Sequence, residues 1–236
     1  MSILPFDLDP QDATSAPMGL IVLQTDETLE PEFRHYFADD PAPMYVNRIP
    51  SGAEVTTDTL SAMEAALPAA ARLLPDARPY SVVGYGCTSG SAVIGSDTVA
   101  ELVKRGCDTA QVTNPLRAAM AMATDRGVAR LALISPYIEE VNAPLRRAFA
   151  AGGLSTDVFG TFSQAEEATV ARISADSVIQ AALRLGRDPA ADAVFLSCTN
   201  LRTLRAIPEI EAELGKPVFS SNSALAWHMR RLRRGV

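Results

Sequence analysis

The sequence predicts an α/β protein built from two similar halves, each a small parallel sheet with helices on both faces. The first observation is a series of short apolar runs that end in small residues, which is typical of buried parallel strands. The second is that these runs alternate with segments of helical spacing. The third is a repeat, because most of this pattern recurs 111 residues further along the chain. Since crossovers between parallel strands are right-handed, each half is predicted to be a compact four-stranded βα unit.

The first half begins after residues 1–17, a stretch rich in Pro, Asp, Ser and Thr without periodicity, which is predicted to be a loose leader. Four apolar runs are predicted as strands: residues 18–23, 43–49, 81–86 and 109–113. The helical patterns between and after them are the start of a helix at residues 30–36, then residues 56–74, 96–105 and 115–126. We predict that Asn114 caps the last of these helices, with Pro115 at its first position.

The second half repeats this order, although few residues are identical. Shifted by 111 positions, the first strand, the second strand and the long helix fall on residues 131–134, 155–160 and 167–185. The fourth strand recurs slightly earlier, at residues 218–222. A last helix near residues 224–234 is predicted to return and pack on the first half. The predicted parts are therefore a leader (1–17), a first half (18–115 plus 224–236) and a second half (116–223).

Composition and charge narrow the class of protein. The chain has 236 residues, of which 47% are hydrophobic and 21% charged, as is ordinary for globular proteins. Its net charge is −7 and its basic residues cluster only at residues 230–234, which argues against a nucleic-acid partner. We see no signal peptide, and no apolar run approaches the roughly 18 residues that would span a membrane. Three cysteines, an odd number, indicate free thiols in a reducing compartment, so we predict a cytoplasmic protein without a membrane partner. The sequence leaves open whether the chain forms a homo-oligomer.

Cys87 and Cys198 are the predicted catalytic residues. A lone strand cysteine is more often a small buried apolar residue, but these two follow equivalent strands of the repeat. Parallel α/β sheets collect their chemistry at that end of the strands. Each cysteine also precedes small polar residues suited to a helix N-terminus, whose N–H groups lower a thiol pKa and hold a carboxylate. Cys107 has no counterpart in the repeat and is predicted to be structural.

Other chemistries have little support in the sequence. The glycines of residues 84–90 are spaced G-x-G-x-x-x-G, which departs from the dinucleotide fingerprint, and we expect them to let a substrate approach the backbone. The two histidines and three cysteines lack metal-ligand spacing. The two lysines lie beside polar turns, and no serine has a placed His–Asp pair. We therefore predict neither a metal nor a cofactor.

Polar residues at the predicted strand ends are candidates for binding the substrate. Tyr137 follows the first strand of the second half, so its hydroxyl could reach the same cleft, although an ordinary half-buried tyrosine is an equal alternative. Gln24 and Thr25 occupy the equivalent place in the first half. The full set of predicted substrate-binding residues is Gln24, Thr25, Thr88, Ser89, Tyr137, Thr199 and Asn200. His228 on the last helix is predicted to be structural.

Several motifs resemble those of the aspartate/glutamate racemase superfamily, above all its branch with arylmalonate decarboxylase and maleate cis–trans isomerase. They are GCTSG at residues 86–90, SPY at 135–137, SCTNLRT at 197–203, and GKPV at 215–218 leading into residues 221–228. Within this branch the chain is most similar to proteins associated with ectoine utilisation. The resemblance covers nearly all of the chain after the leader. It implies two pseudosymmetric halves with the active site in the cleft between them and no cofactor, with Cys87 and Cys198 as the catalytic pair and Tyr137 as a ligand of the substrate carboxylate.

The sequence leaves three hypotheses for the function of this chain. Two thiols on opposite faces of one carbon allow racemisation or cis–trans isomerisation of a small carboxylate, which is our first hypothesis. The second is an arylmalonate-type decarboxylase that relies mainly on Cys198, since those enzymes keep only the second cysteine. The third is a non-catalytic module that binds a small anion. The chain also departs from maleate isomerases, which commonly have asparagine where Gln24 stands and apolar residues around the first cysteine.

Overall fold

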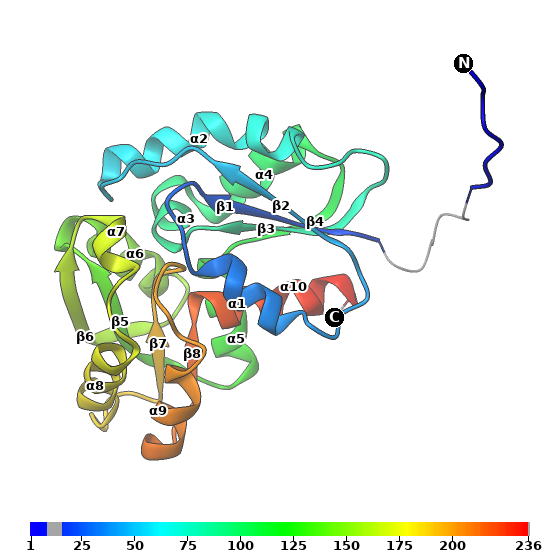
Figure 1. Ribbon diagram of the computed structural model, residues 1–236. Helices are drawn as coiled ribbons and strands as arrows, with labels where there is room; N and C mark the ends of the chain where they lie inside the picture. Colours follow the sequence, from blue (N-terminus) through cyan, green and yellow to red (C-terminus); the bar gives the residue numbers. More distant parts are fainter. Residues whose placement is uncertain (9–15, 236) are drawn as a thin grey trace.

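Two four-stranded parallel sheets form the framework of the computed structural model, which describes residues 1–8 and 16–235 (Figure 1). The strand order is β2–β1–β3–β4 in the first sheet and β6–β5–β7–β8 in the second, with every pair parallel. The strands are β1 (Met18–Leu23), β2 (Met44–Ile49), β3 (Tyr80–Gly86), β4 (Thr109–Thr113), β5 (Arg130–Tyr137), β6 (Ser155–Gln164), β7 (Ala193–Leu196) and β8 (Val218–Ser220). The identical order confirms the predicted fold class.

Helices flank both sheets. They are α1 (Leu29–Tyr36), α2 (Thr57–Arg72), α3 (Thr88–Ile94), α4 (Ser96–Gly106), α5 (Pro115–Asp125), α6 (Glu139–Ala151), α7 (Glu167–Val170), α8 (Ala175–Gly186), α9 (Ala206–Leu214) and α10 (Ser221–Arg233). Within the described residues, none of these helices is long and apolar enough to cross a membrane. Of the predicted leader, residues 9–15 lie outside the described part, and residues 1–8 contain neither helix nor strand.

Alternate residues of the central strands explain how each sheet is covered on both faces. In β1, Ile21 packs into the core that includes α2 and α4, whereas Leu20 packs into the core that includes α1 and α10. In β5, Ile134 faces the core with α8 and α9, whereas Leu133 faces the core with α5 and α6. Because successive side chains of a strand point to opposite faces, an all-apolar strand of this kind must be covered on both sides.

Two helices pack away from the strands that precede them. Helix α5 follows β4 of the first sheet, but its Leu116 and Met122 pack with Phe219 of the second sheet. Helix α10 follows β8 of the second sheet and returns beside α1, where Met229 packs on the first sheet (Figure 1). A Cβ atom at Gly84 would lie 2.7 Å from the Met229 sulfur, so a larger residue there would displace the Met229 side chain from β3.

Two helices differ from the prediction. A short helix, α3, precedes the predicted helix at residues 96–105 and is separated from it by Gly95, whose φ of +94° favours glycine. The long helix predicted at residues 167–185 is divided into α7 and α8. The division arises because the Ser174 hydroxyl accepts the Ser177 N–H at 3.1 Å and so caps a new helix.

Candidate active site

Cys87 and Cys198 come from different sheets and line the same small cavity. Cys87 directly follows β3, and Cys198 lies two residues beyond β7, the equivalent strand of the second sheet. Their exposed fractions are 5% and 3%. The cavity has a volume of about 10 Å³ for the centre of a water-sized sphere, the room that about one water needs. Its lining consists of Leu23, Val55, Leu60, Cys87, Thr88, Ser89, Tyr137, Glu167, Cys198 and Thr199.

Cys87 is the N-cap residue of α3. Its sulfur accepts the Gly90 N–H at 3.2 Å, and its carbonyl accepts the Ser91 hydroxyl at 2.6 Å. A Cβ atom at Gly90 would lie 2.9 Å from the Cys87 sulfur, closer than a side chain permits. Glycine at position 90 therefore allows the thiol to lie against the first turn of α3. The sequence predicted that these glycines let a substrate approach the backbone, and at Gly90 the group that lies close is the Cys87 thiol.

Cys198 sits in a different backbone environment. Its φ is +149°, in a region that residues with a side chain seldom occupy. Its N–H donates to the Ser221 hydroxyl at 3.0 Å, and its sulfur accepts the Asn200 N–H at 3.2 Å. A turn follows at residues 199–200, and the next helix begins only at Ala206. The expectation of a helix N-terminus after both cysteines is thus correct for Cys87 and wrong for Cys198.

Tyr137 links Cys198 to a buried carboxylate. The Tyr137 hydroxyl lies 3.0 Å from the Cys198 sulfur and donates to Glu167 Oε1 at 2.8 Å. The other carboxylate oxygen, Oε2, accepts the side-chain amide of Asn200 at 2.8 Å. Glu167 is only 3% exposed. The cleft position predicted for Tyr137 is matched by these contacts, and a relay from the thiol through the phenol to the carboxylate becomes available.

Sequence reasoning missed Glu167. It starts α7, and its N–H donates to the carbonyl of Ala53 at 3.0 Å, next to a β-bridge between Glu54 and Glu166. The connection after β2 thereby holds the carboxylate against the cavity. Its place in the repeat, opposite the start of the long helix of the first half, is the signal that could have marked it.

The loop after β1 contributes Leu23 to the cavity, and Gln24 does not reach it. Side chains alternate at the end of a strand, so Leu23 faces inward and Gln24 is exposed. Thr25 pairs its hydroxyl with that of Ser51 at 3.1 Å and does not line the cavity either. Asp26, which was not predicted, is 3% exposed; its Oδ1 accepts the N–H groups of Thr28 and Leu29, each at 2.8 Å.

Several predicted binding residues hold the two sheets together. The Thr88 hydroxyl is 2.7 Å from that of Ser221, and the Thr199 hydroxyl donates to the Gly86 carbonyl at 3.3 Å. The Asn200 side-chain oxygen accepts the Glu27 N–H at 2.9 Å. These bonds fix the walls of the cavity relative to each other. Ser89 is buried in the same lining.

A second buried carboxylate joins the halves behind the site. Glu32 of α1 accepts the N–H groups of Thr203 and Leu204 at 2.6 and 3.1 Å. It also accepts the Thr203 hydroxyl and the Asn222 side-chain amide, both at 2.9 Å. Glu32 is 4% exposed. Its two oxygens therefore fasten α1 to the segment after β7 and to the first turn of α10.

The electrostatics of the cavity favour protonated thiols in the unliganded protein. Burial raises the pKa of Cys87 to about 12, against the opposing Gly90 N–H, and the charges of Glu167 and Asp26 add to the rise. Burial and then the charge of Glu167 raise the pKa of Cys198 well above its ordinary value. Burial also raises the pKa values of the Glu167 and Asp26 carboxyls. The expected lowering of the thiol pKa by helix N–H groups is thus overturned, because desolvation outweighs those bonds.

The remaining candidates are structural. His228 accepts or donates a bond with the Thr113 hydroxyl at 2.7 Å, and burial, with the charges of Arg117 and Arg231, lowers its pKa to about 4. Cys107 is half-buried, packs at the edge of the core, and donates to the Val103 carbonyl at 3.6 Å. Within residues 1–8 and 16–235, no group of three or more His, Cys, Asp or Glu residues is arranged to hold a metal ion.

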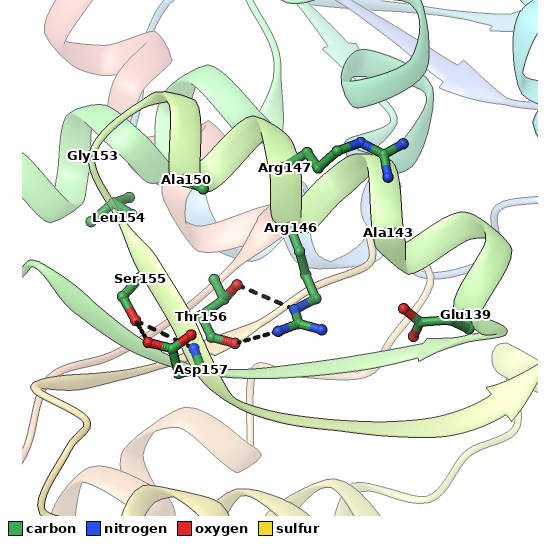
Figure 2. Close-up of a pocket in the computed structure, with 10 residues that line it drawn as sticks. All are labelled: Glu139, Ala143, Arg146, Arg147, Ala150, Gly153, Leu154, Ser155, Thr156 and Asp157. Atoms are coloured by element: carbon green, nitrogen blue, oxygen red, sulfur yellow. Dashed lines mark hydrogen bonds between the residues drawn. The ribbon is translucent and has the colours of Figure 1, made fainter.

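A larger surface hollow lies elsewhere. It has a volume of about 620 Å³ and lies between α6 and the start of β6 (Figure 2). Arg146 there donates to the backbone carbonyl of Thr156 at 3.3 Å, and Arg147 points away from that contact (Figure 2). None of its lining residues belongs to the cysteine cavity. Size alone therefore does not identify the site, and the paired thiols do.

The fold and the paired cysteines define an α/β protein of the aspartate/glutamate racemase superfamily, in the branch of arylmalonate decarboxylase and maleate isomerase. The family model for arylmalonate decarboxylase matches residues 40–234, so the chain belongs to that family. Arylmalonate decarboxylase of Bordetella bronchiseptica is 36% identical over 110 residues, and this match spans 46% of each chain, about half of that relative's length.

Solved structures with the same fold include isomerases as well as decarboxylases. A maleate cis–trans isomerase mutant of Nocardia farcinica with a covalently bound succinylcysteine intermediate has a TM-score of 0.83, at 23% identity over 92% of both chains. Maleate isomerase Iso of Pseudomonas putida S16 has a TM-score of 0.80, at 21% identity over 92% of both chains. A structure of arylmalonate decarboxylase has a TM-score of 0.71, at 26% identity over 93% of both chains. These relatives are enzymes.

Proposed function

We propose that this chain is a cofactor-independent isomerase or racemase of a small carboxylate, with Cys87 and Cys198 as its two reacting groups. One observation carries the proposal: both thiols line a single cavity, each following the equivalent strand of its own sheet. Each sulfur accepts one backbone N–H at 3.2 Å, which holds it in place. A site that needed only one thiol would give no reason for the second to reach the same cavity.

In racemisation, a thiolate removes the proton from the carbon next to the carboxylate, and the other thiol returns a proton to the opposite face. The first cysteine ends as a thiol and the second as a thiolate, so protons balance and the next turnover runs in the opposite sense. The growing enediolate charge needs donors. Donors next to Cys87 in the chain are the hydroxyls of Thr88 and Ser89 and the N–H groups at the start of α3.

Cis–trans isomerisation uses the same two groups differently. One thiolate adds to a carbon–carbon double bond, the bond between the former alkene carbons rotates, and the thiolate leaves again. The second cysteine protonates the adduct carbon and takes the proton back on elimination. The succinylcysteine adduct of the Nocardia farcinica isomerase mutant supports this route by analogy of fold.

Decarboxylation is the second candidate function, because the matching family model and the 36% identical relative are both arylmalonate decarboxylases. Loss of CO₂ from a malonate-type substrate leaves an enediolate that needs one proton. A single thiol supplies it, and in this reading Cys198 acts while Cys87 is dispensable.

The experiment is a screen of small carboxylates in D₂O by proton NMR. Racemisation exchanges the proton next to the carboxylate, isomerisation converts one alkene into the other, and decarboxylation yields a deuterated monocarboxylate. For an active substrate, Cys87→Ser and Cys198→Ser are each expected to lower turnover by about 10² or more, because serine is far less acidic than cysteine. Cys107→Ser is the matched control and should keep wild-type turnover, with circular dichroism to confirm folding.

The variants separate the candidate functions. Comparable losses in both cysteine variants support the two-thiol reaction. Wild-type turnover in Cys87→Ser together with loss in Cys198→Ser favours the decarboxylase. Wild-type turnover in both variants removes the thiols from the mechanism, and no conversion of any carboxylate leaves only the binding module.

A further inference from the structure

Residues 1–8, here called the arm, present large apolar side chains to solvent. Figure 1 shows the arm extended away from the rest of the chain. Five of its side chains are each at least 77% exposed: Met1, Ile3, Leu4, Phe6 and Leu8. Solvated tails are poor in such residues, and exposed apolar surface that is contiguous marks a binding segment. The arm therefore has the composition of a segment that docks on another surface.

The spacing within the arm matches an extended segment with one apolar face. Leu4, Phe6 and Leu8 recur at every second position, and such positions point to the same side of an extended chain. Together they form an apolar face about 13 Å long. Pro5 lies between them, and its fixed φ lowers the entropy lost when the arm binds in this form.

An apolar groove lies between α1 and the edge strand β2. It has a volume of about 400 Å³, and its apolar lining consists of Leu20, Phe33, Phe37, Ala42, Met44 and Val46. Val46 is 42% exposed. Among the described residues, no strand pairs with the outer side of β2. A sheet edge with an exposed apolar side chain is a site at which another segment can bind.

We propose that the arm of one copy of this chain binds in the apolar groove of a second copy, with the two arms exchanged about a two-fold axis. This inference concerns assembly and is independent of the reaction at the cysteine cavity. The chain leaves the arm and enters β1 beside the groove, because the Met18 N–H donates to the Pro43 carbonyl at 2.9 Å, between Ala42 and Met44. A two-fold axis near this corner brings each arm next to the other copy's groove.

The connection between the arm and β1 favours a second copy over the chain's own groove. Pro17 restricts Ala16 to extended conformations, so the chain is directed away from the start of β1. Nine residues separate Leu8 from Met18, and they span up to about 35 Å, which is enough to reach a neighbouring copy. Binding to the chain's own groove would require these nine residues to reverse direction.

Charge favours the same arrangement. Residues 1–17 contain three aspartates and no Lys or Arg. The basic end of α10 adjoins the groove, because the Arg230 guanidinium lies 4.7 Å from the centre of the Phe37 ring. A hollow at this end is lined by four arginines and two aspartates, so it retains net positive charge. The acidic segment that follows a docked arm would therefore meet positive charge beside the groove.

The first test is the mass of the full chain in solution, by light scattering and sedimentation over a range of concentrations. The wild type is expected to be a dimer. The double variant Leu4→Asp/Phe6→Asp should raise the dimer dissociation constant by about 10²-fold or more, because it removes two apolar anchors. Val46→Glu changes the groove instead and should also weaken the dimer.

Leu73→Asp is the matched control. Leu73 is 73% exposed at the end of α2, which packs on the opposite face of the first sheet from Leu20. Its replacement changes an exposed leucine in the same way as the arm variant does, and should leave the dissociation constant unchanged. Circular dichroism confirms that each variant is folded.

A cross-link then identifies the surface that the arm contacts. Phe6 is replaced with the photoreactive residue p-benzoylphenylalanine, and the illuminated protein is analysed by denaturing electrophoresis and mass spectrometry. The expected product has twice the mass of one chain and joins position 6 of one copy to the segment 20–46 of the other.

The outcomes decide the proposal. A dimer that weakens in the arm and groove variants and cross-links between copies supports it. A wild-type monomer at every concentration overturns it, as does a dimer whose dissociation constant is the same in Leu4→Asp/Phe6→Asp as in Leu73→Asp. A cross-link within one chain means that the arm binds its own groove, and a cross-link outside the segment 20–46 means that the arm binds another surface. Either result also overturns the proposal.

Discussion

The two cysteine sites occupy equivalent positions in two sheets of identical strand order, yet their surroundings differ. Cys87 caps a helix in an ordinary extended conformation, with φ of −147°. The nearby Tyr85 hydroxyl bonds to the Met63 sulfur at 3.6 Å and lowers the pKa of Cys87. Cys198 lies in a turn at φ of +149°, and its tyrosine, Tyr137, is bonded to a carboxylate. The repeat therefore determines the positions of the two thiols, while their local contacts give them different backbone conformations and hydrogen-bond partners.

This difference indicates that the two sheets contribute different chemical groups to the candidate active site. The first sheet contributes donors at the start of α3, and the second contributes the phenol and carboxylate. A substrate that spans the cavity therefore meets donors at one end and negative charge at the other.

The largest effect is expected from removing the Glu32 carboxylate, which connects α1 to the second half. Glu32→Ala leaves the N–H groups of Thr203 and Leu204 and the Asn222 amide without their acceptor. Unsatisfied buried groups of this kind cost about 1–3 kcal/mol each, so we expect the free energy of unfolding to fall by roughly 3 kcal/mol. Urea unfolding followed by circular dichroism measures the loss.

Glu64→Ala is the control for this substitution, because Glu64 is exposed on α2. Its free energy of unfolding should stay within about 0.5 kcal/mol of the wild-type value. An equally small change in Glu32→Ala would show that the hydrogen bonds of Glu32 between α1 and the second half contribute little to stability.

The two tyrosines test the chemical difference between the thiols. In the thiolate form of Cys198, the Tyr137 hydroxyl turns its single proton from Glu167 to the sulfur and so lowers the pKa of that thiol. Tyr137→Phe removes this bond, and we expect turnover to fall by about 10²-fold. The alkaline rise of the pH–rate profile should also move to higher pH, since the lost bond lowers the thiol pKa in the wild type. The Tyr85 hydroxyl bonds to the Met63 sulfur and also lowers the pKa of Cys87, but it is not bonded to a carboxylate, so we expect Tyr85→Phe to reduce turnover less than Tyr137→Phe does. Equal losses of turnover in the two tyrosine variants would contradict a chemical difference between Cys87 and Cys198.

The raised thiol pKa also makes stability depend on pH. The Cys87 pKa rises from 9.0 to about 12 on folding, so the folded state retains a proton that the unfolded chain releases in that window. The resulting stabilisation is complete below pH 9 and is lost as the pH rises through about 12. We expect the unfolding free energy to fall by about 1 kcal/mol per pH unit in this range for this group. Cys87→Ser should show a shallower decline in urea titrations than the wild type, and an identical decline would mean that Cys87 is not desolvated.

The smallest effect concerns backbone strain. At Cys198, glycine accepts φ of +149° more readily than alanine does, so Cys198→Gly should be more stable than Cys198→Ala by about 1 kcal/mol. At Cys87 the order should reverse, because φ of −147° suits alanine and glycine only adds flexibility to the unfolded chain. Thermal unfolding of the four variants compares them directly. The same order at both positions would exclude a conformational difference between the sites.

The sequence was sufficient to predict the architecture because apolar periodicity and the 111-residue repeat both report on burial. It also predicted that Cys87, Cys198 and Tyr137 reach one cleft, since strand ends in parallel sheets are recognisable, and all three line the same cavity. It did not reveal α3, whose seven residues are too short for a periodic pattern. Glu167 is not predicted, because a glutamate beside another glutamate looks like an exposed helix face and the residues that surround it, among them Ala53 and Tyr137, are distant in sequence. The sequence pointed to Gln24 and not to Asp26 because the exact end of β1, which decides which side chains face inward, is not encoded in a local pattern.

The small volume of the cysteine cavity has a thermodynamic consequence. A space with room for about one water is smaller than any carboxylate, so a substrate can bind only to a form in which the walls of the cavity have moved apart. If that open form is a minor population, the apparent dissociation constant equals the intrinsic one divided by the open fraction. The contacts that join the halves, from Thr88, Thr199 and Glu32, set that fraction. Substitutions there would tighten apparent binding while destabilising the fold, so affinity and stability in this protein are coupled with opposite sign.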